Sequence, residues 1–308
     1  MRFRGLIGAI LVLATMALVA AFILSEPKPL AATALPPRTP NVGNGQYVFA
    51  AGGCANCHAT RGQPDRTLLG GGYTIRSPFG SFLVPNVSSD TTHGIGAWTE
   101  LQFANAMLRG IGRNGEHLFP SFPYTSYQRM TLDDVRDLYA YMKTLPGDAT
   151  PSQPHQVGFP FNVRRAIGIW KLLYFDGGPV PPAAGSQPPE VARGAYLVEA
   201  LAHCAECHSS RNLLGAIPPD KRFAGGFEGG GRSWIGNITP HPDGLPDWTR
   251  KDWELLLETG FTPDGIATGG PMRDVIRSTS ALKAEDRTAM AAYLKSLPPR
   301  AGRKPGAN

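Results

Sequence analysis

Strand-like alternation and clustered charge are both scarce in this chain of 308 residues. Few segments alternate apolar and polar residues, which excludes a mainly β fold and the βαβ pattern of a thioredoxin-like redox protein. The net charge of +6 is spread along the chain. No basic stripe is interleaved with aromatic residues, so we expect no nucleic-acid partner. Cysteine is scarcer still, at four residues, and their positions carry the main functional signal.

The four cysteines form two C-x-x-C-H pentapeptides, at residues 54–58 and 204–208. This pattern attaches c-type haem, because its two thiols join the vinyl groups of the porphyrin and its histidine binds the iron from the proximal side. We therefore expect two covalently bound haem c groups. Their attachment and iron-binding residues would be Cys54, Cys57 and His58 in the first motif, and Cys204, Cys207 and His208 in the second.

Two other uses of paired cysteines fit the sequence less well. A zinc site usually places its C-x-x-C pairs about 15 to 20 residues apart, whereas 146 residues, 58–203, separate these two pairs. Disulfide bonds would leave the two following histidines unexplained. Haem attachment accounts for every cysteine and for both histidines.

The N-terminus carries a membrane signal. Arg2 and Arg4 precede Gly5–Leu24, a run of 20 uncharged residues that is long enough to span a bilayer as a helix. A cleavable signal peptide has a shorter apolar core and a nearby cleavage site, and the candidate site at residues 32–34 lies too far downstream. We expect residues 1–24 to be an uncleaved anchor in a bacterial cytoplasmic membrane, with a removed signal peptide as the alternative. In both cases the rest of the chain is periplasmic.

Beyond a proline-rich tether at residues 25–43, the chain repeats itself. Trp98-Thr99 recurs 150 residues later as Trp248-Thr249, and near the C-terminus the offset grows to 152. A repeat of this length predicts duplicated domains. We place the two haem domains at residues 44–146 and 191–300, with a linker at 147–190 and a tail at 301–308.

Each repeat shows three helical patterns separated by glycine-rich loops. The first runs into the haem motif from about Gly45 or Gly194. The second begins at a threonine cap, Thr99 or Thr249, and ends at a glycine. The third follows Thr131 and places apolar residues at helical spacing. These patterns predict an all-α fold with two tandem haem domains after an N-terminal transmembrane helix.

The linker contains one segment, Arg164–Phe175, that is too apolar to hang in water. One interpretation is a short helix packed across the two haem domains. The other is an apolar patch that meets a partner subunit or the membrane surface.

A methionine sulfur can complete the coordination of haem iron, and it raises the reduction potential. Met272 follows the second helix of the second repeat, where a single-haem domain brings its methionine to the iron, and a core-filling role is the alternative. The equivalent residue of the first repeat is Phe122, which cannot ligate iron. Met130 is our first choice there, followed by His117 and His93. A vacant or water-bound position is the remaining option.

Several segments outside the motifs are similar to segments of a known protein family: residues 117–127, 138–141, 161–164, 170–173 and 193–199. Together with the paired motifs they resemble the membrane-anchored cytochrome c subunits of periplasmic alcohol, aldehyde, gluconate and fructose dehydrogenases. The resemblance implies cytochrome c-like domains that take electrons from a periplasmic catalytic subunit toward quinone or a terminal oxidase. Many members of that family have three haem domains, whereas this chain has two.

Two other functional classes are consistent with paired haems. A diheme enzyme, of the peroxidase or thiosulfate-oxidising type, would keep an open or unusual sixth position on one iron. A haem-based gas sensor would normally carry a signalling domain, and the sequence contains none that we recognise. We expect an electron-transfer subunit without catalytic residues of its own rather than a catalytic chain.

Overall fold

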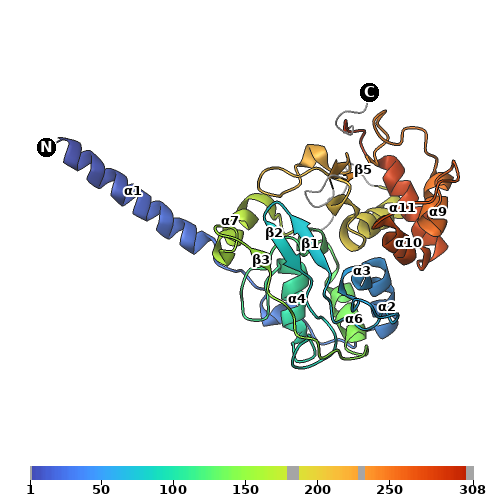
Figure 1. The fold of residues 1–308 in the computed structure, drawn as a ribbon, viewed down its shortest axis with the longest axis horizontal. Coiled ribbons are helices and arrows are strands. Elements are labelled where there is room, and N and C mark those ends of the chain that lie inside the picture. The colour runs from blue at the N-terminus through green and yellow to red at the C-terminus, as the bar shows by residue number, and fades with distance from the viewer. Residues whose placement is uncertain (1, 179–186, 228–232, 303–308) are drawn as a thin grey trace.

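The computed structural model describes residues 2–178, 187–227 and 233–302, and it shows one long helix leading into a two-module body (Figure 1). The long helix, α1 (Arg2–Leu24), projects from that body. Its Leu6–Leu24 segment has a mean hydropathy of 2.8, and none of it is buried inside the protein. Its length and composition suit a membrane span, and a signal sequence would share them. The linker prolines near 180 and tail residues 303–308 lie outside the described residues.

The first module has the three helical segments that its repeat pattern predicts. Thr99 caps α4 in a reciprocal capping box with Gln102, and Gly110 ends that helix in the left-handed conformation. Thr131 caps α6 by accepting from the backbone N–H of Asp134. The elements are η1 (Ala32–Ala34), α2 (Val42–Ala51), α3 (Cys54–His58), β1 (Thr74–Ser77), β2 (Gly80–Leu83), α4 (Glu100–Arg109), α5 (Tyr124–Tyr127), α6 (Leu132–Met142) and β3 (Gln156–Val157).

The second module repeats this plan. Thr249 and Asp252 form the capping box of α9, and Gly260 ends the helix with a φ of 79°. The predicted cap and stop are therefore confirmed in both copies. The elements are α8 (Pro189–Ala195), η2 (Tyr196–Leu201), η3 (Cys204–Glu206), η4 (Pro219–Lys221), β4 (Gly226–Phe227), β5 (Trp234–Ile235), α9 (Arg250–Thr259), α10 (Met272–Ser280) and α11 (Ala284–Ser296).

In each module the first and last helices cross at a glycine. A Cβ atom built on Gly45 would lie 1.9 Å from the backbone oxygen of Asp137, and one built on Gly194 would lie 1.9 Å from that of Ala289. Neither position can carry a side chain without moving a helix backbone. Glycine therefore lets α2 pack directly on α6, and α8 on α11, just before each haem motif.

One residue is inserted in the second module between this crossing and the haem motif. The crossing glycines, Gly45 and Gly194, are 149 residues apart, whereas Cys54 and Cys204 are 150 apart. The helix absorbs the extra residue by continuing α8 as the π-helical turn η2, which holds more residues per turn than an α-helix. The haem motif thereby keeps its place at the end of the helix.

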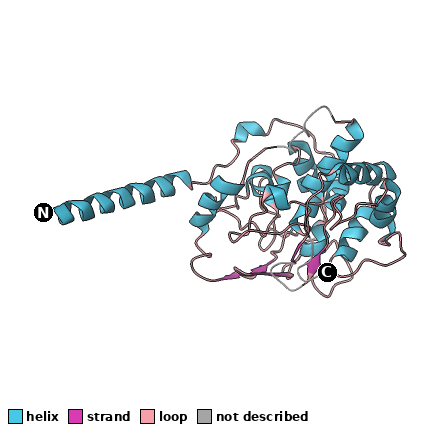
Figure 2. Ribbon diagram, turned by 90° about the horizontal axis from the view of Figure 1, so that it is seen from above, coloured by secondary structure: helices cyan, strands magenta, loops and turns pink. Residues whose placement is uncertain are grey.

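The fold is mostly helical, but the described residues also contain five short strands, which the all-α expectation misses (Figure 2). Strands β1 and β2 form an antiparallel hairpin in which Ile75 lies opposite Phe82, and β3 pairs with β2. Phe82 is buried against Phe119 and His155. Strands of two to four residues leave too little alternation for a sequence pattern to reveal.

A single apolar core runs through both modules. It includes Val48 and Leu138 of the first module and Leu201 and Met290 of the second. Helix α5 lies against η2, and α10 lies against α2. Because each contact joins one module to the other, the two modules form one packed body.

The apolar linker segment is a helix, α7 (Arg164–Tyr174). The Lys171 ammonium donates to the carbonyl oxygens of Arg109 and Gly110 at the end of α4, at 2.7 and 2.8 Å. The Trp170 indole N–H donates to the carbonyl oxygen of Leu214 in the second module, at 2.9 Å. The segment is therefore a helix that contacts both modules, as one of the two interpretations expects.

Candidate haem sites

The first haem motif forms one helical turn, α3, directly after α2. Gly53 has a φ of 59° and turns the chain between the two helices. Three positions apart on one turn, Cys54 and Cys57 lie on the same face of the helix. Cys54, Cys57 and Cys204 form no disulfide.

The electrostatic environment of the cysteines argues against a dithiol redox pair. Burial raises the pKa of the Cys54 thiol to about 12 and that of the Cys204 thiol to about 12. Reactive C-x-x-C pairs have a lowered thiol pKa instead. These two thiols therefore lack the lowered pKa of a thiol-exchange pair.

Both motif histidines are oriented by a backbone carbonyl. The Nδ1 atom of His58 lies 3.0 Å from the oxygen of Pro85, and that of His208 lies 2.8 Å from the oxygen of Gly236. A carbonyl oxygen can only accept, so each Nδ1 carries the hydrogen and each Nε2 keeps its lone pair. Burial also lowers the pKa of both rings, which favours the neutral form. This is the tautomer and support expected of a metal-binding histidine.

A buried asparagine holds each of these carbonyl loops in place. The Asn86 side chain donates to the backbone oxygens of Asp148 and Thr150, at 2.7 and 2.8 Å. The Asn237 side chain donates to the backbone oxygen of Arg300 at 2.8 Å. Because Asn86 and Asn237 directly follow Pro85 and Gly236, they fix the oxygens that orient the two histidines.

Cys54 and Met130 of the first module line one small apolar cavity, which Leu201 of the second module also lines. Met130 is only 6% exposed. A second methionine, Met107 of α4, lines the same cavity, and our sequence analysis missed it. The counterpart of Met107 in the second module is Leu257. A methionine that stands where the other repeat has leucine is the sequence signal that could have identified it.

The other sixth-ligand candidates occupy different surroundings. Met272 is the first residue of α10 and packs against the core. Phe122, at the matching place in the first module, packs against the ring of Tyr127 at 5.6 Å. His117 is buried beside α7, where its Nε2 donates to the carbonyl oxygen of Ser25 at 2.8 Å. Neither His117 nor His93 lines the cavity of Cys54.

Each motif forms hydrogen bonds with the opposite module, in a reciprocal arrangement. Asn56 of the first motif donates to the hydroxyl of Ser278 in the second module, at 3.1 Å. Glu206, at the same place in the second motif, accepts from Thr125 at 2.9 Å and Ser126 at 3.2 Å in the first module. Ser126 and Ser278 are themselves equivalent at the offset of 152. The modules therefore meet like the subunits of a two-fold dimer.

An aromatic contact joins the two sites at this interface. Tyr127 lines the cavity of Cys54, and its ring centroid lies 5.6 Å from that of His203. His203 immediately precedes Cys204 and takes a φ of 42°, the conformation that Gly53 adopts before the first motif. The chain thus places one ring from each module between the two attachment motifs.

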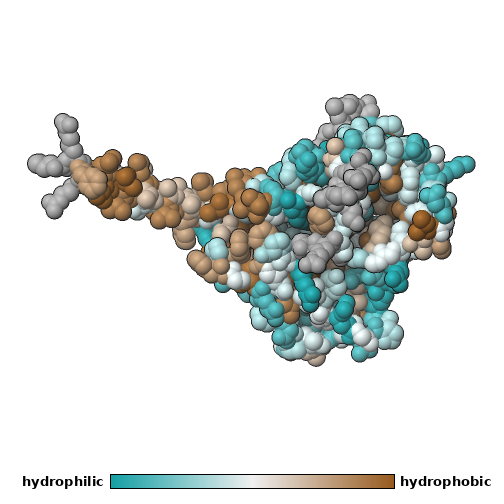
Figure 3. Space-filling view, turned by 45° about the horizontal axis from the view of Figure 1, so that its top comes forward, coloured by the Kyte–Doolittle hydropathy of each residue, from teal (hydrophilic) through white to brown (hydrophobic). Residues whose placement is uncertain are grey.

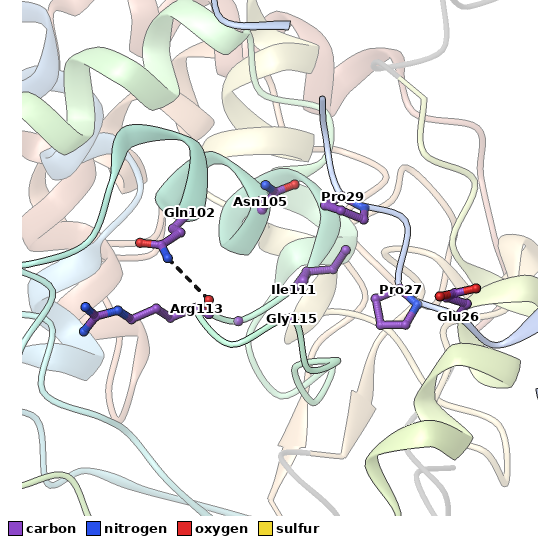
Figure 4. Close-up of a pocket in the computed structure, with 9 residues that line it drawn as sticks. Glu26, Pro27, Pro29, Gln102, Asn105, Ile111, Arg113 and Gly115 are labelled. Carbon is purple, nitrogen blue, oxygen red and sulfur yellow. Dashed lines mark hydrogen bonds between the residues drawn. The ribbon is translucent and has the colours of Figure 1, made fainter. Parts of the chain in front are cut away.

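A larger hollow lies elsewhere, where the chain after α1 crosses α4 (Figure 4). Glu26, Pro27 and Pro29 form one wall of it, and Gln102 of the opposite wall donates to the carbonyl oxygen of Arg113 at 3.4 Å. No motif cysteine or histidine lines this hollow. It is a gap beneath the tether and not a haem site.

The paired cysteines and the tautomers of the two motif histidines are those that covalent haem requires, so the fold and its motifs fit a c-type haem protein. The chain belongs to the cytochrome c family, whose model matches residues 42–146 and 191–298. The expected family resemblance is thereby confirmed.

Three relatives show which members of the family this chain is similar to. It is 46% identical to the diheme cytochrome c-type protein of Cereibacter sphaeroides, over 84% of this chain and 87% of that one. It is 39% identical to the fructose dehydrogenase cytochrome subunit of Gluconobacter japonicus, over 90% of this chain and 56% of that one. It is 32% identical to the gluconate 2-dehydrogenase cytochrome c subunit of Pantoea cypripedii, over 83% of this chain and 59% of that one. The chain thus spans just over half of the two dehydrogenase subunits.

Proposed function

We propose that this chain is the diheme electron-transfer subunit of a periplasmic dehydrogenase. It would carry two covalent haem c groups and pass electrons from a separate catalytic subunit toward quinone or a terminal oxidase. The dehydrogenase partner is supported by the similarity to cytochrome subunits of fructose dehydrogenase and gluconate 2-dehydrogenase. Bound haem supplies an iron that changes reversibly between its ferric and ferrous states.

The observation that carries this proposal is the pairing of two similar sites across one interface. Each motif bonds to the opposite module, through Asn56 and Ser278 on one side and Glu206 and Thr125 on the other. Two equivalent sites held on either side of one interface suit transfer of electrons between two haems.

We assign the protein residues around each haem as follows. Cys54, Cys57 and His58 would hold the first haem, and Cys204, Cys207 and His208 the second. Met272 would be the sixth ligand of the second iron. For the first iron, Met130 is the proposed ligand because it shares a cavity with Cys54, and Met107 is its rival there.

We also propose that α1 anchors the protein in the bacterial cytoplasmic membrane with the haem modules in the periplasm. Its apolar segment of 19 residues, Leu6–Leu24, is long enough to span the bilayer. The native protein should stay in the membrane fraction after a high-salt wash. Release by salt alone would contradict the anchor.

The function is tested on the tagged full-length chain purified from solubilised membranes. A pyridine haemochrome assay should return two c-type haems per chain, and a dehydrogenase subunit should co-purify and reduce both haems when its substrate is added. Carbon monoxide binding to the reduced protein, with no co-purifying dehydrogenase, would instead favour the diheme enzyme.

A further inference from the structure

Helix α7 turns its charged side toward the protein and its apolar side outward, which is the reverse of a surface helix in water. Its charged residues Arg164, Arg165 and Lys171 contact protein atoms, and Lys171 is only 9% exposed. Leu173 points outward and is 63% exposed, and Ile169 and Leu172 are exposed on the same side. A helix facing water turns its apolar side inward. The outer side of α7 is therefore built for an apolar neighbour.

Two flanking loops extend this apolar surface. Phe161 packs its ring 5.0 Å from that of Phe79 and remains exposed, as does its neighbour Phe159. Leu214 is exposed next to α7, where its carbonyl accepts from Trp170. We call the outer face of α7 with these loops the α7 patch: Phe159, Phe161, Ile169, Leu172, Leu173 and Leu214.

The α7 patch adjoins the end of α1. The guanidinium of Arg165 lies 4.4 Å from the ring centroid of Phe22 in the last turns of α1. Gly168 packs so closely on Ser25 that an added Cβ would lie 2.2 Å from the Ser25 oxygen. Figure 3 shows the apolar surface of α1 continuing onto the body where the helix joins it. The face of the body from which α1 projects therefore also carries the apolar α7 patch.

We propose that the α7 patch lies in the interfacial layer of the bilayer that α1 crosses. The occupant is lipid, because the patch is continuous with the membrane-spanning surface and lies at the depth where that span ends. An interfacial helix buries its apolar side about 5–10 Å into the boundary of headgroups and acyl chains. The proposal rests on the anchoring role of α1. Two attachments, one spanning and one lying flat, would hold both haem modules at a fixed tilt to the membrane.

The first test places an environment-sensitive fluorophore on the patch of the full-length, haem-loaded chain. In nanodiscs of phosphatidylcholine and phosphatidylglycerol, a label on Leu173→Cys should emit at shorter wavelength and be quenched by lipids with a quencher near the headgroup. The matched control is Ile266→Cys, because Ile266 is apolar and 65% exposed and lies in the loop between α9 and α10. Figure 1 shows these two helices on the side of the body opposite α1. A label on Ile266→Cys should emit at the longer wavelength typical of water and should not be quenched by these lipids.

Each other outcome has a distinct meaning. A chain that does not enter nanodiscs contradicts the anchor itself. A chain that enters them while the label at 173 reports water overturns the lipid proposal. Protection at 173 that appears only when a catalytic subunit is bound would assign the patch to a protein partner and also overturn it.

A second test uses no fluorophore, because a label can drive its own insertion. The double variant Leu172→Glu, Leu173→Glu should remain anchored and haem-loaded but lose the linear dichroism of its haem absorption in oriented bilayers. The variant Ile266→Glu should keep it. Unchanged dichroism in the double variant would mean that α7 does not set the tilt.

Discussion

The hydroxyl of Tyr47 in the first module donates to the carboxylate of Asp286 in the second, at 2.5 Å. The same bond occurs in reverse, because Tyr196 of the second module donates to Asp134 of the first at 2.5 Å. Both tyrosines stand two residues after the crossing glycines. The duplication has therefore produced an interface whose polar contacts come in equivalent pairs.

Replacing Tyr47 by Phe should destabilise the protein without disturbing either haem motif. The change removes a hydrogen bond to a charged group, worth about 1.5–3 kcal/mol, and urea unfolding followed by circular dichroism would measure it. Tyr196→Phe should cost a similar amount. Tyr141→Phe is the control, since that ring also packs in the core region and no hydrogen bond of its hydroxyl appears among the described residues. Equal losses in all three would contradict a specific role for the interface bonds.

The Asp286 carboxylate should make stability depend on pH in the acid range. Burial raises its pKa, but hydrogen bonds from Arg193 and Tyr47 outweigh burial, so the pKa lies below the ordinary value of 3.8. A lowered pKa stabilises the folded state at neutral pH, and this contribution is lost as the pH falls below about 4. The stability difference between the wild type and Asp286→Asn should therefore shrink on acidification. Asp264→Asn, at an exposed aspartate, controls for the lost charge, and a parallel decrease there would refute the assignment.

The crossing glycines should tolerate no side chain. Gly45→Ala and Gly194→Ala each force a methyl group onto a helix backbone, and we expect a loss of about 3 kcal/mol or more in the free energy of unfolding. Gly43→Ala in the same helix has its nearest neighbour at 3.4 Å and should lie within about 1 kcal/mol of the wild type. If Gly45→Ala proves as stable as Gly43→Ala, the direct packing of α2 on α6 is not needed.

Methionine replacements should distinguish the sixth ligands of the two irons. Near-infrared magnetic circular dichroism of the oxidised protein should lose one His/Met band in Met130→Leu and the other in Met272→Leu. The midpoint potential of the altered haem should fall, on the order of 0.1 V, because axial ligands set haem potentials over a range of about 0.8 V. Met107→Leu should keep both bands. Loss of a band in Met107→Leu, with Met130→Leu unaffected, would reverse the assignment.

The sequence alone determined the features that depend on short spacings. The C-x-x-C-H motifs and the threonine caps are local patterns, and the repeat offsets can be read directly from the sequence. No long-range packing was therefore needed to recognise two copies of a C-x-x-C-H module. The family resemblance followed from the same segments. The helix at Arg164–Tyr174 was also predictable, because its apolar residues lie at helical spacing.

Tertiary structure decided which side chains meet. Nothing in the sequence pairs His58 with the carbonyl of Pro85, or Tyr47 with Asp286, because these partners are far apart in the chain and neither residue type dictates the other. The inverted face of α7 depended on packing in the same way. Periodicity shows that a helix has an apolar side, but only its neighbours decide whether that side turns inward, and here the ends of α1 and α4 take the charged side instead.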